Sequence, residues 1–199
     1  MNNSKSESSP NFLIMIIIVV MVIVLCGGKF EKEGDSNVKP QSTFQLSNNK
    51  SNNGKGMQVS DEDFNNLTML VLAEAGGQPH DGQVAVVATV LNRYKERNYA
   101  SIYDVIFAPG QFSCCVNGYF CHGDGIPLSF SDYPQEMIDN AMSAVEEGLE
   151  GKDPTKDALG GGCLYYYNPD YTSNEELAKR ANIQTTYRIG DHVFYREWT

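Results

Sequence analysis

Glu74 stands out because a carboxylate occupies an apolar position of a predicted helix. It follows Leu67 by seven residues, Leu70 by four and Val71 by three, which places it on the apolar stripe. A carboxylate there loses hydration, and the helix dipole near the predicted C-terminus disfavours its negative charge, so we expect its pKa to rise. A Glu that stays protonated near neutral pH can act as a general acid, for example toward a glycosidic oxygen. The alternative is a Glu at the exposed end of a frayed helix.

A second cluster combines Cys114, Cys115, Cys121 and His122, residue types that can bind a metal. Their spacing fits no common zinc pattern and adjacent cysteines are awkward ligands, so we predict no metal site. The Asn-Gly pair at 117–118 predicts a two-residue hairpin turn that places Cys114 opposite Cys121. A Cys114–Cys121 disulfide fits an exported domain. The pair falls on a hydrogen-bonded site of the hairpin, where the Cα atoms are about 5.5 Å apart, so the geometry allows a disulfide without favouring it. Free buried cysteines are the alternative.

Helices are expected to position these residues. The first follows Ser60, an N-cap residue before three acidic residues, and ends at the Gly-Gly-Gln-Pro turn of residues 76–79. The second, at about 81–97, is apolar nearly all round in its middle and is predicted to be the buried central helix. Two further helices are predicted at 101–107 and 134–147.

Strands are few and come late in the chain. They are predicted as a hairpin at 112–116 and 119–121, a single strand at 164–167, and a final hairpin at 185–189 and 192–196. Dominant helices with few, late strands predict an α+β fold.

The N-terminal part differs from the rest in composition. Residues 12–26 are fifteen consecutive apolar residues, and we expect residues 12–28, after a short tail at 1–11, to be a membrane anchor. A cleaved signal peptide and a lipoprotein acylated at Cys26 are the alternatives. Residues 29–59 are rich in Asn, Ser, Lys and Gly and predict a flexible linker. Residues 60–199 form the predicted folded domain, outside the membrane.

The folded part is strongly acidic. Residues 1–59 hold six Lys and four Asp or Glu, a net charge of +2, whereas the whole chain has a net charge of −10. Residues 60–199 therefore carry −12. Because a polyphosphate backbone needs clustered Lys and Arg, nucleic acid is excluded as a partner, whereas a sugar ligand is not.

An ordered series of motifs resembles the SleB/CwlJ-type cell wall hydrolases, which include the spore cortex-lytic enzymes. The series consists of LVLAEAGGQP at 70–79, GQVAVVA at 82–88, LNR at 91–93, VIF at 105–107, PGQF at 109–112, DP at 153–154, YYYNP at 165–169 and IGDHVFY at 189–195. It spans almost the whole predicted domain. The resemblance implies a compact lysozyme-superfamily-like domain, mainly helical with small β-hairpins, that cleaves the glycan strand of peptidoglycan without a cofactor.

The resemblance also implies how the reaction proceeds. Family members with a known mechanism act as lytic transglycosylases, and their catalytic acid corresponds to Glu74. A second Glu that is common four residues later is replaced here by Gln78. A single acid can protonate the leaving oxygen and then take the proton of the sugar's own 6-hydroxyl, giving 1,6-anhydromuramic ends. A hydrolase would normally need a second carboxylate, for which Asp81, Asp104 and Asp124 are candidates.

Substrate contacts are predicted for polar and aromatic residues near the expected cleft: Gln78, Gln111, Phe112, Tyr165, Tyr167, Asn168 and His192. On a strand, Tyr165 and Tyr167 face one side and Tyr166 the other, and one of these sides can stack on sugar rings. His192 is either a groove residue or a cap on the last strand.

Two rival functions remain at this stage. One is a glycan-binding module that keeps the fold without catalytic activity. Gln78 in place of the common second Glu favours this function, whereas the retained Glu74 argues against it. The other is a membrane-tethered scaffold of a spore or division complex. The sequence does not predict whether the substrate is spore cortex or vegetative wall, or the oligomeric state.

Overall fold

The computed structural model describes residues 56–197. The predicted tail at 1–11, the apolar segment at 12–28 and nearly all of the linker at 29–59 lie outside the described residues. Within the described part, no helix combines the length and the hydropathy that crossing a membrane requires.

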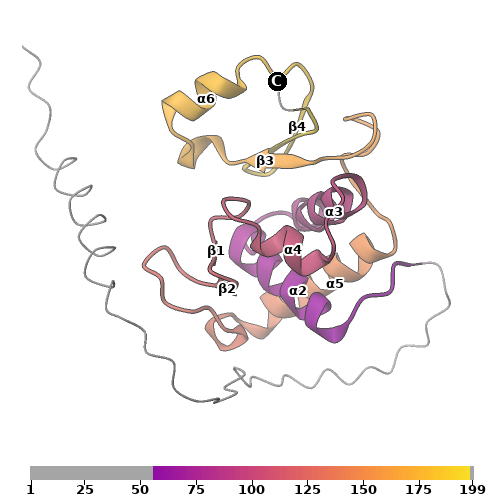
Figure 1. The fold of residues 1–199 in the computed structure, drawn as a ribbon, viewed down its shortest axis with the longest axis vertical. Helices are drawn as coiled ribbons and strands as arrows, with labels where there is room; N and C mark the ends of the chain where they lie inside the picture. The colour runs from indigo at the N-terminus through magenta and orange to yellow at the C-terminus, as the bar shows by residue number, and fades with distance from the viewer. Residues whose placement is uncertain (1–55, 198–199) are drawn as a thin grey trace, which may run out of the picture. The chain divides into compact units, whose positions relative to one another are not determined.

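Four helices form the body of the domain (Figure 1): α2 Asp61–Ala75, α3 His80–Glu96, α4 Ile102–Phe107 and α5 Gln135–Leu149. The N-terminus of α2 is where we expected it, because the Ser60 hydroxyl accepts a hydrogen bond from the Asp63 N–H at 3.0 Å. Residues 82–91 of α3 are all buried, and α3 packs against α2, α4 and α5. The predicted central helix is therefore confirmed.

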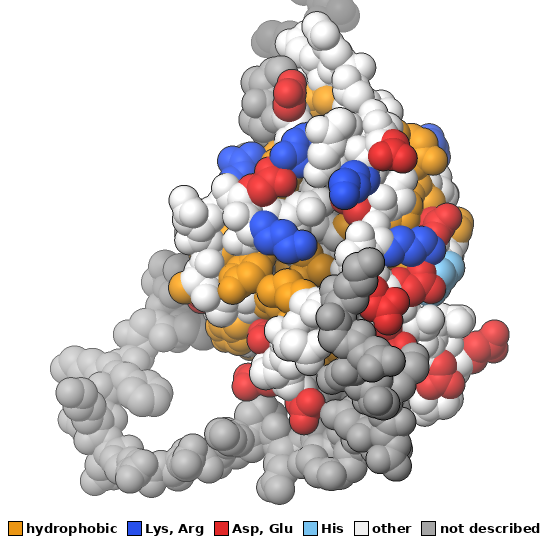
Figure 2. Space-filling model, turned by 90° about the vertical axis from the view of Figure 1, so that its right-hand side faces the viewer, with side chains coloured by type: hydrophobic (Ala, Val, Ile, Leu, Met, Phe, Trp, Pro, Cys, Tyr) orange, Lys and Arg blue, Asp and Glu red, His pale blue; other side chains and the backbone are white. Residues whose placement is uncertain are grey.

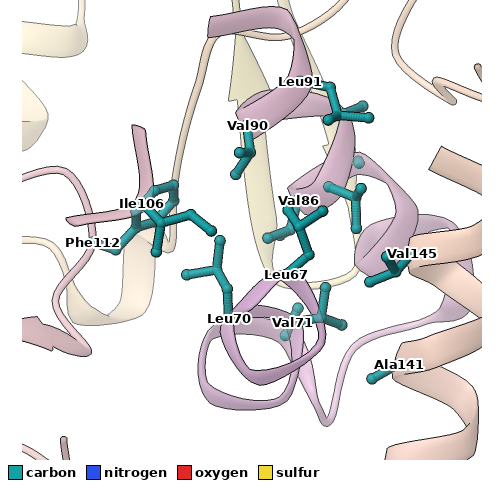
Figure 3. Packing of buried hydrophobic residues seen from close by; sticks show 14 of the residues in the cluster. Leu67, Leu70, Val71, Val86, Val90, Leu91, Ile106, Phe112, Ala141 and Val145 are labelled. Carbon is teal, nitrogen blue, oxygen red and sulfur yellow. The ribbon is translucent and has the colours of Figure 1, made fainter. Parts of the chain in front are cut away.

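The hydrophobic core lies between these helices (Figure 3). Leu70 of α2 points toward Ile106 of α4, and Val71 lies on the side of Val145 of α5. Leu70, Val71, Ile106 and Val145 have no exposed surface. Burying a side chain of this size stabilises the fold by about 1.5–3 kcal/mol, so this core fixes α2 against its neighbours.

The first hairpin consists of β1 Cys115–Val116 and β2 Tyr119–Phe120, which are shorter than the predicted strands. Its register is the predicted one, with Val116 opposite Tyr119 and Cys115 opposite Phe120. The turn residues Asn117 and Gly118 have positive φ values of 52° and 86°. A tight two-residue turn requires this conformation, which explains the Asn-Gly pair.

A three-stranded antiparallel sheet comprises β3 Tyr165–Tyr167, β4 Thr186–Ile189 and β5 His192–Tyr195, in the order β3-β5-β4. The strand at β3 and the final hairpin are confirmed. The central strand β5 is buried throughout, and it places Phe194 opposite Tyr166. Helices with small sheets confirm the α+β class, whereas the predicted N-terminal hydrophobic helix lies outside the described residues.

Three short elements were not predicted: the 3-10 helices Phe130–Asp132 and Pro169–Tyr171, and α6 Asn174–Arg180. α6 buries none of its residues, so it has no apolar periodicity to detect. Its N-cap is Ser173, and Glu176 forms ion pairs with Lys179 and Arg180 at 2.7 Å. Figure 1 shows α6 next to the three-stranded sheet at one end of the domain.

The surface mixes both charge signs. On the face in Figure 2, Lys and Arg side chains lie among Asp and Glu side chains. Ion pairs on the domain include Lys152 with Asp81 at 3.0 Å and Arg196 with Glu96 at 2.6 Å. Such partly exposed pairs contribute little stability.

Partly buried polar contacts fix the loop between α5 and β3 to α3. The Asn92 side chain donates to Asp153 Oδ2 at 3.0 Å and to the Cys163 carbonyl oxygen at 2.9 Å. The other Asp153 oxygen accepts from the N–H and the hydroxyl of Thr155. Gly162 has a φ of 91°, and a Cβ there would overlap Asp153 Oδ2. This arrangement, which we call the Asp153 brace, sets the position from which β3 begins.

We expect Gly162→Ala to lower the free energy of unfolding by about 2–5 kcal/mol. The positive φ costs an Ala about 1–2 kcal/mol, and the displaced Asp153 loses buried hydrogen bonds worth about 1–3 kcal/mol. Gly160→Ala is the matched control, because Gly160 has a φ of 64° but open space at Cβ. Gly160→Ala should lower the free energy of unfolding only by the cost of the positive φ, about 1–2 kcal/mol. Urea unfolding measures the free energy of unfolding of both variants. An equal decrease for Gly162→Ala and Gly160→Ala would mean that the Asp153 brace contributes little stability.

Candidate active site

Glu74 lies at the C-terminal end of α2 and its side chain is half-buried. Its Oε1 accepts hydrogen bonds from the Ser113 hydroxyl at 3.3 Å and the Cys114 backbone N–H at 3.4 Å. Its Oε2 accepts one from the Tyr166 hydroxyl at 3.1 Å. Two of these distances are longer than is usual for hydrogen bonds. Leu67, Leu70 and Val71 are buried as predicted, whereas Glu74 lies at the edge of their stripe.

Tyr166 holds the carboxyl group from the opposite side. Its ring packs against His192, Phe194 and Phe112, with centroid distances of 5.0, 5.5 and 6.3 Å. Burial raises the pKa of the Tyr166 hydroxyl well above its ordinary value, and the negative charge of Glu74 adds to the shift. The hydroxyl therefore stays protonated and remains a donor to Glu74.

His192 is the first residue of β5 and is only 5% exposed. Burial lowers its pKa, while the nearby charges of Glu74 and Asp191 oppose that shift. Its Nδ1 is buried and has no hydrogen-bond partner among residues 56–197. His192 thus packs as a neutral ring beside Tyr166 and brings no positive charge to Glu74.

The predicted Cys114–Cys121 disulfide is absent, because both cysteines are free thiols. The two residues do face each other across the hairpin, where the Cys121 N–H donates to the Cys114 carbonyl oxygen at 2.9 Å. The Cys114 thiol instead contacts Cys115, with 3.7 Å between the sulfur atoms. The hydrogen-bonded cross-strand position aligns the backbones of Cys114 and Cys121 without joining their side chains.

Gln78 is bound to the β4–β5 turn. Its Nε2 donates to Asp191 Oδ2 at 3.0 Å, and its Oε1 accepts from the Asp191 N–H at 2.9 Å. Both ends of the amide are therefore used within the domain. Gln78 therefore positions the turn that precedes His192, and its predicted contact with a substrate stays a prediction.

The other predicted contacts are distributed around the site. Phe112 is 5% exposed and packs against Tyr166. Tyr165 and Tyr167 lie on the opposite face of β3 from Tyr166 and pack against Tyr195. The Asn168 side chain accepts from the Asp170 N–H and caps a 3-10 helix. Gln111 is half-buried, two residues before Ser113.

Three residues around the site, Ser113, Tyr166 and Asp191, carry no sequence pattern that predicts their contacts. Strand alternation separated Tyr166 from its two neighbours but does not reveal which face meets Glu74. Ser113 contacts Glu74, which lies 39 residues earlier in the sequence. Asp191 contacts Gln78, which lies 113 residues earlier. No local pattern marks such contacts.

The sequence of this domain matches the family model described as Cell Wall Hydrolase over residues 77–195, a segment that starts just after Glu74. The spore cortex-lytic enzyme of Halalkalibacterium halodurans is 35% identical over 136 residues, 68% of this chain and 35% of that protein. The spore cortex-lytic enzyme of Bacillus cereus is 32% identical over 167 residues, 81% of this chain and 56% of that protein. The chain therefore spans only part of the length of these relatives.

A solved structure is also similar. The catalytic domain of the germination-specific lytic transglycosylase SleB from Bacillus anthracis has a TM-score of 0.50 and 29% sequence identity. The similarity covers 72% of this chain and 98% of that chain. Since the family model covers more than half of the chain and includes Tyr166 and His192, this chain belongs to the cell wall hydrolase family.

Proposed function

We propose that this domain cleaves the glycan strand of peptidoglycan, with Glu74 as general acid and then general base. The observation that carries the proposal is the half-buried Glu74 carboxyl group held by three donors in a cell wall hydrolase domain. The similar Bacillus anthracis domain is described as a lytic transglycosylase, and the proposal extends that chemistry to this chain.

The reaction has two proton transfers. Protonated Glu74 first gives its proton to the glycosidic oxygen, and the bond between that oxygen and the anomeric carbon breaks. The Glu74 carboxylate then takes the proton of the sugar's 6-hydroxyl. The 6-hydroxyl oxygen attacks the anomeric carbon at the same time. The product is a 1,6-anhydro sugar, and no water is consumed.

The three donors suit a carboxyl group that changes its protonation state twice. The hydroxyls of Ser113 and Tyr166 can each donate or accept, so they can stay bonded to both states of Glu74. The Cys114 N–H only donates, and it therefore favours the carboxylate that forms in the first step. The raised pKa of Tyr166 keeps its proton on the hydroxyl through both steps.

The other carboxylates considered as second catalytic groups have partners elsewhere. Asp81 pairs with Lys152 at 3.0 Å, Asp104 accepts from the Ser101 hydroxyl at 2.8 Å, and Asp124 accepts from the Ile126 N–H at 3.1 Å. Asp191 near His192 is bound to Gln78. These contacts support a reaction with one acid and the substrate's own nucleophile.

We further propose that the domain works outside the cytoplasmic membrane, with residues 12–28 as anchor and residues 29–59 as tether. The similar proteins named spore cortex-lytic enzymes support a peptidoglycan substrate.

Glu74→Gln should reduce turnover on purified peptidoglycan by about 10²–10⁴-fold, because the amide keeps the shape but has no proton to transfer. Its unfolding midpoint should stay near that of the wild type. Glu62→Gln is the matched control, because Glu62 is an exposed residue of the same helix. Release of soluble muropeptides measures turnover. Activity of Glu74→Gln within a few-fold of the wild type would remove Glu74 from the mechanism.

Tyr166→Phe should lower kcat by about ten- to a hundredfold with little change in KM. The ring still packs on His192 and Phe194, but a hydrogen bond to a charged group, worth about 1.5–3 kcal/mol, is lost. Tyr171→Phe is the matched control and should keep wild-type kcat, because the Tyr171 side chain is 91% exposed. Steady-state kinetics on solubilised glycan strands compare the two. Equal kcat values would mean that the Tyr166 hydroxyl is structural only.

A further inference from the structure

The proposed reaction uses the backbone of Cys114 but leaves a pair of thiols unused. Cys114 is buried and Cys115 is half-buried, and their sulfur atoms lie 3.7 Å apart. Two free thiols at this distance are near enough to react, because a disulfide joins its sulfur atoms at about 2.05 Å. Closing the bond between adjacent residues requires a change of the local backbone, since their Cα atoms, about 3.8 Å apart, are nearer than in most disulfides. We call Cys114 and Cys115 the vicinal dithiol.

The vicinal dithiol is directly connected to Glu74. The Cys114 N–H and the Ser113 hydroxyl are the two donors to Glu74 Oε1, at 3.4 and 3.3 Å. A covalent bond between adjacent side chains closes a small ring that includes the peptide unit from Cys114 to Cys115. That ring requires a backbone rearrangement at Cys114. The rearrangement moves the donors, and their hydrogen bonds to Glu74 are already long.

We propose that the vicinal dithiol is a redox modification site, and that its oxidation by a small-molecule disulfide withdraws the Ser113 and Cys114 donors from Glu74 and slows glycan cleavage. The effect on cleavage rests on the proposed function. The modification itself does not.

The chemistry is thiol–disulfide exchange. The Cys115 thiolate attacks one sulfur of the oxidant, forms a mixed disulfide and releases one thiolate. The Cys114 sulfur, as thiolate, then attacks Cys115 Sγ, forms the Cys114–Cys115 bond and releases the second thiolate. Two electrons pass to the oxidant, and the two protons lost by the cysteines end on the released thiols.

Exposure and contacts decide the order of these steps. The hydrogen bond with Cys115, burial and the charge of Glu74 all raise the pKa of the Cys114 thiol, so the more accessible Cys115 attacks first. Cys121 is 3% exposed and meets Cys114 through its backbone. Cys163 is fully buried against Thr89 and Ala85. Both are therefore less accessible to the oxidant than Cys115.

Peptide mapping identifies the bond. The full chain is treated with oxidised glutathione, quenched in acid, alkylated with N-ethylmaleimide and cleaved with chymotrypsin, which cuts after Phe112, Tyr119 and Phe120. Fragment 113–119 carries both Cys114 and Cys115, and Cys121 falls in a separate fragment. We expect fragment 113–119 without alkyl groups and two hydrogens lighter than its reduced form. A bond that links it to the Cys121 fragment, or both thiols still alkylated, would overturn the proposal.

Activity then tests the consequence. The oxidised wild type should cleave peptidoglycan about tenfold more slowly than the reduced form, since donors to a charged group are lost, and dithiothreitol should restore it. Cys115→Ser should keep the reduced rate under both conditions. Cys121→Ser, the matched control in the same hairpin, should stay sensitive to oxidation.

The outcomes separate the two proposals. Equal rates for reduced wild type and for wild type with the mapped Cys114–Cys115 bond would contradict the link to Glu74. A reduced chain that cleaves nothing would contradict the proposed function. The mapped bond would in that case still establish the vicinal dithiol as the modification site.

Discussion

A carboxyl group at the C-terminal end of a helix faces the negative end of the helix dipole, and it depends on donors from elsewhere in the chain. In this domain the group is Glu74 at the end of α2, and its donors are Ser113, Cys114 and Tyr166. The rest of the fold can be understood as the means of bringing the loop before β1 and the strand β3 to this one helix end.

Three sets of contacts do this. The buried helix α3 fixes α2 on one side and, through Asn92 and the Asp153 brace, the start of β3 on the other. Gln78 holds Asp191, so the turn before His192 is fixed relative to the end of α2. His192 and Phe194 then support the Tyr166 ring. The geometry around Glu74 depends on long-range polar contacts over an apolar core.

The sequence was sufficient for local features with a strong physical cause. Ser60 before three acidic residues fixed the start of α2, and Asn117-Gly118 fixed the first hairpin and its register. Glu74 could be identified because a charge at an apolar position is unusual. The contact of Tyr166 with Glu74 could not be predicted. Strand alternation places Tyr166 on one face and Tyr165 and Tyr167 on the other, but it does not show which residues each face meets. The contact between Gln78 and Asp191 could not be predicted because the two residues are 113 positions apart, and α6 was missed because it buries nothing.

The mass of the cleavage products tests most directly whether Glu74 acts as a single acid, with the sugar's own hydroxyl as nucleophile. Purified peptidoglycan is digested with the reduced chain, and the released muropeptides are analysed by mass spectrometry. The account predicts 1,6-anhydromuramic ends, which are one water lighter than hydrolysis products and resist reduction by borohydride. Hydrated, reducible ends alone would contradict it, because they would require a second carboxylate to activate water or to act as nucleophile beside Glu74.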